Sequence, residues 1–199
     1  RRLAGPVEVQ RHAVLLGPSL ELRARVLRAV VDGDLYRCAA LTDEPLSIVW
    51  TPVFMRAYGR AFLDSPGPPD QGQQSHFFIT PPADDATPES IASYMREDND
   101  RMLRLLCIHE GVPGHYLQLA ASNRSPSLIR TVFGDGMFAE GWAVYVTQVM
   151  MDAGYGADDP ALLLTHWKFY LRAVANAILD VETHTRDMTE GEAIDLMVR

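Results

Sequence analysis

The chain has 199 residues, 47% of them hydrophobic, which is enough to bury the core of a globular domain. Its 26 acidic and 18 basic residues give a net charge of -8, so we expect no basic face for DNA or RNA. No run of about eighteen apolar residues occurs, and we therefore expect no membrane-spanning helix.

The first third of the sequence predicts two helices. Apolar side chains recur every four positions over residues 19–31, which predicts an amphipathic helix that ends near Gly33. The pattern is ambiguous from there to Pro45. A second helix is expected over residues 52–62, followed by a loop at 64–72 that is rich in proline and glycine.

Residues 75–80, Ser-His-Phe-Phe-Ile-Thr, are the best candidate for a strand, which two prolines terminate. The strand contains His76, but a lone histidine on an extended segment is seldom a metal ligand. The two cysteines, Cys38 and Cys107, match no disulfide framework or zinc motif. We expect Cys107 to be a buried thiol that packs as a small hydrophobic group.

A long helix is expected to begin at Thr87 and Pro88, which suit the N-cap and the first turn. Along this helix Met102, Leu106 and His109 follow one apolar seam. The imidazole of His109 should therefore point inward, where an unsatisfied polar group is costly. A metal ion would satisfy it.

Residues 109–118 read His-Glu-Gly-Val-Pro-Gly-His-Tyr-Leu-Gln. Neutral imidazoles bind zinc, and zinc with three protein ligands lowers the pKa of its water to about 7. A carboxylate beside the first ligand can accept the proton of that water. The segment therefore predicts His109 and His115 as zinc ligands and Glu110 as the catalytic base.

The spacing of the two histidines requires a break in the helix. His109 and His115 are six residues apart, which puts them roughly 120° from a common face of an unbroken helix. Gly111, Pro113 and Gly114 lie between them and are residue types that interrupt helices. We predict a bulge or kink at Gly111 to Gly114 that returns His115 to the face of His109.

After a turn at 123–126, the sequence predicts a short helix at 127–133 and longer helices at 137–151 and 160–185. Asp159 and Pro160 suit the start of the last of these. One face of it carries a stripe that we expect to be core: Trp167, Leu171, Val174, Ile178 and Val181. A second stripe is polar, which from composition alone favours a solvated face: Arg172, Asn176, Asp180 and His184.

Residues 189–192, Thr-Glu-Gly-Glu, form a capping box that opens a further helix, and the sequence stops inside it at Arg199. The first ten residues have no apolar signal core. We therefore expect residues 1–199 to be a single catalytic domain or the C-terminal fragment of a longer protein. The missing N-terminus leaves the compartment unknown, with the cytoplasm slightly favoured.

The motif His-Glu-Gly-x-Pro-Gly-His-x-x-Gln resembles the signature of the bacterial domain of unknown function 885 (DUF885) family, whose members resemble gluzincin metallopeptidases. Gluzincins take a third metal ligand from a glutamate on a following helix. Residues 138–145 resemble the family's Glu-Gly-Trp-Ala element, so the resemblance implies Glu140 as that ligand. A carboxylate near a helix start is also stable without metal. Trp142 and Tyr145 are expected to pack, and Tyr145 could reach a cleft.

The resemblance runs from about residue 77 to the C-terminus. It implies that Arg172, Asp180 and His184 orient a ligand, stabilise an oxyanion or hold a substrate carboxylate. It also suggests that the strand at 75–80 pairs with a substrate backbone, although the strand could equally belong to the core. Many family members carry two adjacent histidines after Pro-Gly, whereas this chain has Tyr116 as the second residue.

Together these features predict a mainly α, gluzincin-like metallopeptidase catalytic domain with a small strand element. The expected function is that of a zinc-dependent hydrolase whose substrate is a peptide or a small amide. Two alternatives remain open at this point. One is a non-catalytic, metal-binding or structural relative of the peptidase fold. The other is a zinc amidohydrolase that acts on a non-peptide small molecule. Oligomeric state cannot be read from the sequence.

Overall fold

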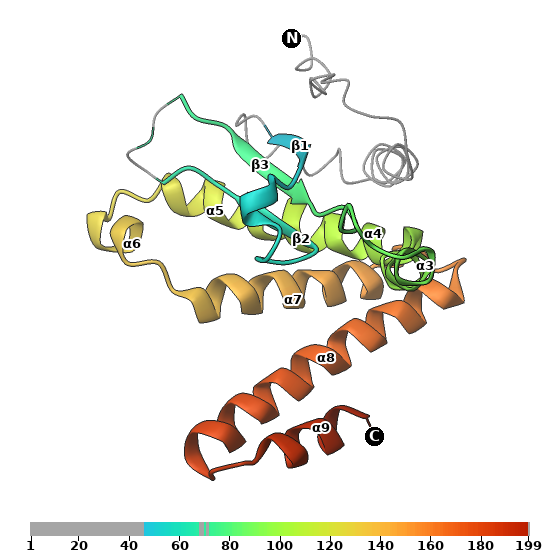
Figure 1. Cartoon of the computed structure of the whole chain (residues 1–199). Coiled ribbons are helices and arrows are strands. Elements are labelled where there is room, and N and C mark those ends of the chain that lie inside the picture. The colour runs from blue at the N-terminus through green and yellow to red at the C-terminus, as the bar shows by residue number, and fades with distance from the viewer. Residues whose placement is uncertain (1–45, 68–69, 71, 199) are drawn as a thin grey trace. The chain divides into compact units, whose positions relative to one another are not determined.

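The computed structural model describes residues 46–67, 70 and 72–198 (Figure 1). This part of the chain is mainly helical and contains a small sheet, as expected. It divides into two compact units, one up to Ala153 and one from Gly154 onward. The helix predicted at 19–31 and the residue Cys38 lie outside the described residues. Among the helices described, none is both long and apolar enough to cross a membrane.

The sheet has the strand order β1-β3-β2, with β1 at Leu46–Trp50, β2 at Ala61–Asp64 and β3 at Ser75–Ile79. β1 runs parallel to β3, and β2 runs antiparallel to it. The strand prediction at 75–80 is therefore confirmed to within one residue. Of the two alternatives left open for this strand, the structure has the core strand: β3 is paired on both sides, carries core residues and offers no free edge to a substrate.

The helix predicted over residues 52–62 is also wrong. Only a single 3-10 turn, η2 at Val53–Met55, forms there, and the end of the segment enters strand β2. The ring of Phe62 stacks on that of Phe78 in β3, with centroids 5.0 Å apart. This pairing across the sheet joins residues that are distant in sequence and overrides the local helical pattern.

Two helices replace the single long helix expected after Thr87. Helix α3 spans Pro88–Glu97, and Thr87 caps it by accepting a hydrogen bond from the amide of Ser90. Helix α4 spans Asp100–Leu106 and has its own N-cap, Asn99, whose Oδ1 accepts from two backbone amides. A side chain that can cap a helix favours a new start at this point.

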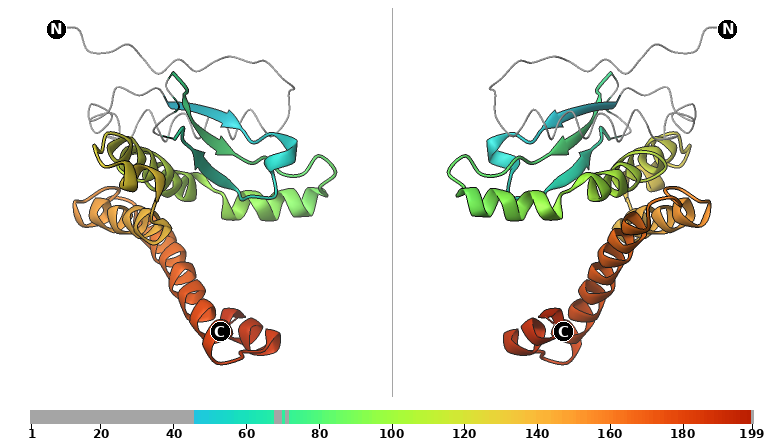
Figure 2. Two further views of the ribbon diagram at one scale, coloured as in Figure 1. Left: turned by 90° about the vertical axis from the view of Figure 1, so that its left-hand side faces the viewer. Right: turned by 90° about the vertical axis from the view of Figure 1, so that its right-hand side faces the viewer.

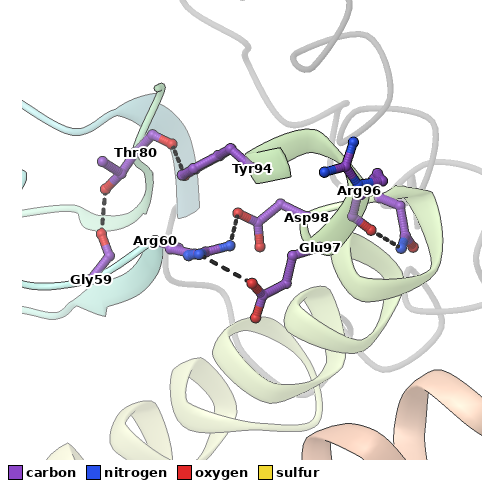
Figure 3. Close-up of polar contacts among 8 residues, drawn as sticks. Gly59, Arg60, Thr80, Tyr94, Arg96, Glu97 and Asp98 are labelled. Carbon is purple, nitrogen blue, oxygen red and sulfur yellow. Dashed lines mark hydrogen bonds and ion pairs between the residues drawn. The ribbon is translucent and has the colours of Figure 1, made fainter. Parts of the chain in front are cut away.

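The break between α3 and α4 coincides with a polar cluster at the end of the sheet (Figure 3). Asp98 is 6% exposed and accepts a hydrogen bond from the guanidinium of Arg60 at 2.9 Å. Arg60 also pairs with Glu97 at 3.2 Å, and the hydroxyl of Tyr94 donates to the carbonyl of Thr80. Burial raises the pKa of Asp98, while Arg60 opposes that rise. The cluster attaches the residue that precedes β2 to the C-terminal end of α3.

The remaining elements of the first unit are the π-helical turn η3 at Cys107–Gly111, α5 at His115–Asn123, α6 at Leu128–Val132 and α7 at Gly136–Asp152. The predicted helices at 127–133 and 137–151 are thus confirmed. The segment from α4 to α5 lies between the sheet and α7 (Figures 1 and 2). Cys107 is 3% exposed, and burial raises the pKa of its thiol to about 12. The thiol is therefore uncharged and packs as a small hydrophobic group, as expected.

The second unit consists of α8 at Pro160–Thr185 and α9 at Glu190–Val198, and both helices were predicted. Asp159 caps α8, and Thr189 and Glu192 form the expected capping box of α9. The predicted core stripe of α8 is wrong for the described residues, because its side chains are 41% to 66% exposed. They are Trp167, Leu171, Val174, Ile178 and Val181.

Candidate functional site

The candidate site is built on an interruption in the helix that carries His109. The helix widens to π geometry over η3 and ends at Gly111, and the next helix, α5, begins at His115. Between them the Val112-Pro113 peptide bond is cis. The kink predicted at Gly111 to Gly114 is therefore confirmed.

Gly114 allows the chain to fold back closely onto the backbone of η3. A Cβ atom at this position would lie 1.9 Å from the carbonyl oxygen of His109 and 2.3 Å from that of Ile108. Both contacts are with backbone, which cannot move aside as a side chain could. A Cβ at Gly111 would meet nothing within 4 Å. The bend thus depends on the missing side chain of Gly114 and not on that of Gly111.

The bend brings the two histidines together with a glutamate from α7. Nε2 of His115 lies 3.6 Å from Oε2 of Glu140, and Nε2 of His109 lies 4.0 Å from the same oxygen. The two imidazole rings are nearly perpendicular, with centroids 4.8 Å apart. One ligand atom from each of the three residues lies within 4.8 Å of the others. The three predicted ligands therefore converge.

The donor atoms of this trio are of the types that zinc binds, and they lie within 4.8 Å of one another. Tetrahedral zinc with bonds of about 2.0–2.2 Å holds its ligand atoms roughly 3.3–3.6 Å apart. The distances to Glu140 are already close to this range. Both imidazoles are buried, whereas the carboxylate side chain is 72% exposed. A bound metal would thus have protein ligands on its inner side and access to solvent on the outer side.

The electrostatics of His115 suit a metal ligand. Burial lowers the pKa of its imidazole, and the negative charge of Glu140 partly opposes this effect. A lowered pKa favours the neutral ring, which is the form that donates a lone pair to a metal.

Glu110 lies beside the trio and is 7% exposed. Burial raises the pKa of its carboxyl group to about 8, and the charge of Glu140 adds to the rise. The backbone amide of Leu63 in β2 donates a hydrogen bond to this carboxyl group, and this bond partly lowers the pKa again. A carboxyl group with a pKa near neutrality has the proton affinity expected of a general base.

Glu140 occupies the fifth position of α7, since the helix begins at Gly136. Glu140 was expected near the start of this helix, but it lies beyond the first turn, which contains no acidic residue. The field at a helix start falls off within that turn. The helix dipole therefore stabilises this carboxylate less than the sequence led us to expect.

Two residues near the bend differ from their expected roles. Tyr116 is 3% exposed, and His115 rather than this tyrosine faces Glu140. The second histidine of the family pattern is thus not needed for the trio. Trp142 was expected only to pack, but its Nε1 also donates a hydrogen bond of 2.9 Å to the carbonyl of Pro113. A buried indole N–H usually finds a partner, so the sequence could indicate that Trp142 donates a hydrogen bond but not that Pro113 accepts it.

The other predicted site residues lie on α8 in the second unit. Nδ1 of His184 is 3.4 Å from a carboxylate oxygen of Asp180, and both side chains are more than 70% exposed. The guanidinium of Arg172 lies 5.3 Å from the ring centroid of Phe169. These contacts are local to α8. The roles predicted for Arg172, Asp180 and His184 rest on the resemblance alone.

Solved structures that share this fold include the following two. One is from Shewanella oneidensis, is 38% identical and has a TM-score of 0.72. The other is from Colwellia psychrerythraea, is 21% identical and has a TM-score of 0.73. Each match covers 90% of this chain but only 32% and 30% of the respective relative, so the chain spans about a third of their length. Both are described as putative lipoproteins, which differs from the cytoplasmic location that the sequence slightly favoured.

No curated protein matches the chain. The family model that describes bacterial proteins of unknown function, DUF885, matches residues 22–199. That range includes the two histidines, Glu110, Glu140 and both helices of the second unit. The chain therefore belongs to the DUF885 family.

Proposed function

We propose that this chain carries the metal centre of a zinc-dependent hydrolase, most simply a metallopeptidase with gluzincin-like chemistry. The observation that carries the proposal is the convergence of His109, His115 and Glu140 beside a buried carboxyl group. Two imidazoles and one carboxylate form a ligand set that catalytic zinc uses in peptidases. The π-helical turn η3 also supports the proposal, because such turns occur frequently at functional sites.

The three ligands would hold the ion on its protein side. When bound, zinc would act as a Lewis acid toward a water molecule and toward a substrate carbonyl. Glu110 adjoins His109 and would accept the proton of the attacking water, then deliver it to the leaving amine. Its carboxyl group is kept in place by the amide of Leu63.

Strand β2 supports a peptide as the substrate class. The carbonyl of Arg60 accepts a hydrogen bond from the amide of Thr80. In an antiparallel pair every second residue faces the partner strand, so the backbone groups of Phe62 and Asp64 also face β3. The backbone groups of Ala61 and Leu63 therefore face away from β3, and the Leu63 amide reaches Glu110. β2 is an edge of the described sheet. An extended peptide could pair with this edge while its scissile bond lies near the base.

Metal content and hydrolysis test the proposal. The purified chain should bind one zinc ion, and it should cleave members of a peptide library when zinc is supplied. Glu110→Gln should retain the metal but lose at least about 100-fold in rate, the lower range for general-base catalysis. Glu89→Gln on the exposed start of α3 is the control and should leave both properties unchanged.

The outcomes separate the proposal from its alternatives. Absence of bound zinc would overturn it. Zinc binding without hydrolysis of any peptide or amide would favour a non-catalytic metal-binding role. Hydrolysis of small amides, with no cleavage of peptides, would assign the chain to amidohydrolase chemistry instead.

A further inference from the structure

We infer that Trp142 is a positioning residue for the metal centre: its indole N–H joins the helix that carries Glu140 to the bend that carries the two histidines. This inference rests on the proposed metal site. It assigns to Trp142 a function beyond packing, namely to set the distance between the carboxylate ligand and the two imidazole ligands.

The hydrogen bond connects two segments that are 29 residues apart in sequence. Nε1 of Trp142 donates to the carbonyl of Pro113 at 2.9 Å, and Pro113 lies between His109 and His115. Glu140 precedes Trp142 by two residues in α7. Residues 140–142 of α7 therefore supply one proposed ligand and also donate a hydrogen bond to the turn between the other two.

The bend needs support from outside itself. Gly114, the N-cap of α5, makes no side-chain capping hydrogen bond. The regular hydrogen bonds of a helix are interrupted between η3 and α5. The Pro113 carbonyl is thus a backbone acceptor within an irregular turn, where a fixed donor restricts the position of the chain.

The indole is itself held by α7. Its ring lies 6.4 Å from that of Phe138 and 6.2 Å from that of Tyr145, and both neighbours belong to the same helix. Trp142 therefore moves with α7 and with Glu140. In contrast, the Glu140 side chain is 72% exposed, so its own surroundings restrict it little. The hydrogen bond of Trp142 fixes the backbone of α7 relative to the bend, and this keeps the carboxylate of Glu140 within reach of both imidazoles.

Groups that orient metal ligands without binding the metal typically change metal affinity by about 10- to 100-fold when they are removed. Trp142→Phe keeps an aromatic ring in place and removes the N–H donor. We expect it to weaken zinc binding by about this factor, measured by competition with a chromophoric chelator. We also expect a changed visible spectrum of the cobalt-substituted protein, because that spectrum reports coordination geometry.

Tyr145→Phe is the matched control. Tyr145 is also an aromatic residue on α7, its ring contacts that of Trp142, and it is 61% exposed. This variant should keep the zinc affinity and the cobalt spectrum of the unsubstituted chain. Circular dichroism of both metal-free variants reports whether they fold.

A measurement on the unsubstituted chain tests the positioning role even if Trp142→Phe does not fold. With 15N-labelled indoles, the Trp142 N–H resonance is assigned by elimination using Trp50→Phe and Trp167→Phe. Zinc should shift this resonance and slow the exchange of its proton, since closure of the trio would tighten the bond to Pro113.

The failures are distinguishable. If the unsubstituted chain does not bind zinc, the proposed function fails and this inference fails with it. If that chain binds zinc but a folded Trp142→Phe shows equal affinity and an equal cobalt spectrum, only the positioning role is wrong. The positioning role is equally wrong if the variant does not fold and the Trp142 resonance of the unsubstituted chain does not respond to zinc.

Discussion

The bend at residues 109–115 and helix α8 are both strongly marked in the sequence, but they differ in what they contact. The seam that ends at His109 predicts an inward-facing imidazole, and His109 is 7% exposed between the sheet and α7. The apolar stripe on α8 predicts a core just as clearly, yet Leu171 is 66% exposed. In these two regions local signals located the helices, whereas burial depends on packing against distant segments that a local pattern does not contain.

The largest expected effect concerns the bend itself. Gly114→Ala places a Cβ within 2.3 Å of two backbone carbonyl oxygens, so the bend must open. We expect a loss of more than about 4 kcal/mol in the free energy of unfolding, together with loss of zinc binding. Denaturant unfolding and chelator competition measure the two effects.

Gly111→Ala is the matched control, because its Cβ has open space. It should bind zinc with the affinity of the unsubstituted chain. Equal behaviour of the two variants would show that the bend does not rely on the close approach at Gly114.

The second effect is on the pH dependence of stability in the metal-free chain. The pKa of Glu110 is raised from 4.5 to about 8 on folding, so its contribution to stability is complete below pH 4.5 and is lost as the pH rises through 8. At roughly 1.4 kcal/mol per pH unit, the loss is at most about 5 kcal/mol. Glu110→Gln should remove this loss and be the more stable protein at pH 9.

Denaturant unfolding of both proteins between pH 4.5 and 9, with a chelator present, checks this prediction. His115 acts in the opposite direction, because its lowered pKa makes stability fall as the pH drops below 6.5. Both proteins contain His115, so its contribution is the same in the two profiles. The difference between the two profiles therefore isolates Glu110. Parallel profiles would contradict the burial of its carboxyl group.

The third effect compares the same substitution in the two regions. Leu105 in α4 is 1% exposed, and Leu105→Ala should cost about 2–5 kcal/mol. Leu171→Ala on α8 should cost less than about 0.5 kcal/mol, because the side chain is largely exposed and alanine suits a helix. Thermal unfolding of the two variants gives the comparison. A large cost at Leu171 would mean that the stripe on α8 is covered after all.

The smallest effect tests the local signals alone. Thr189 caps α9 by accepting a hydrogen bond from the amide of Glu192 at 3.3 Å. Thr189→Ala should lower stability by about 1 kcal/mol. Thr183→Ala, in the exposed interior of α8, should be neutral or slightly stabilising, since alanine is the better helix former. If the two threonines behave alike in unfolding experiments, the capping role assigned to Thr189 is wrong.

Capping residues fix the starts of several helices, and two of them, Thr87 and Asp159, were used to predict those starts. Thr87, Ser127, Asp135 and Asp159 each accept a hydrogen bond at a helix start, and each acts within three residues of its own position. The break between α3 and α4 was missed because Asp98 and Asn99 interrupt a sequence that otherwise keeps helical spacing. The interruption is stabilised by Arg60, 38 residues away from Asp98.

The candidate site was predictable for a similar reason. His109, Glu110 and His115 fall within seven residues, so their spacing and the intervening glycines and proline were sufficient to predict the bend. Glu140 came from the resemblance to a family, since nothing local to α7 identifies a ligand. The contacts of Leu63 with Glu110 and of Trp142 with Pro113 cross between elements, and no local pattern contains them.

The central claim is that two imidazoles and a carboxylate share one metal ion. Crystals of the zinc-loaded chain, measured on both sides of the zinc absorption edge, test it most directly. We predict a single anomalous peak within about 2.2 Å of Nε2 of His109, Nε2 of His115 and the carboxylate of Glu140. Zinc-loaded crystals with no peak there, or with a peak bounded by other side chains, would contradict the account.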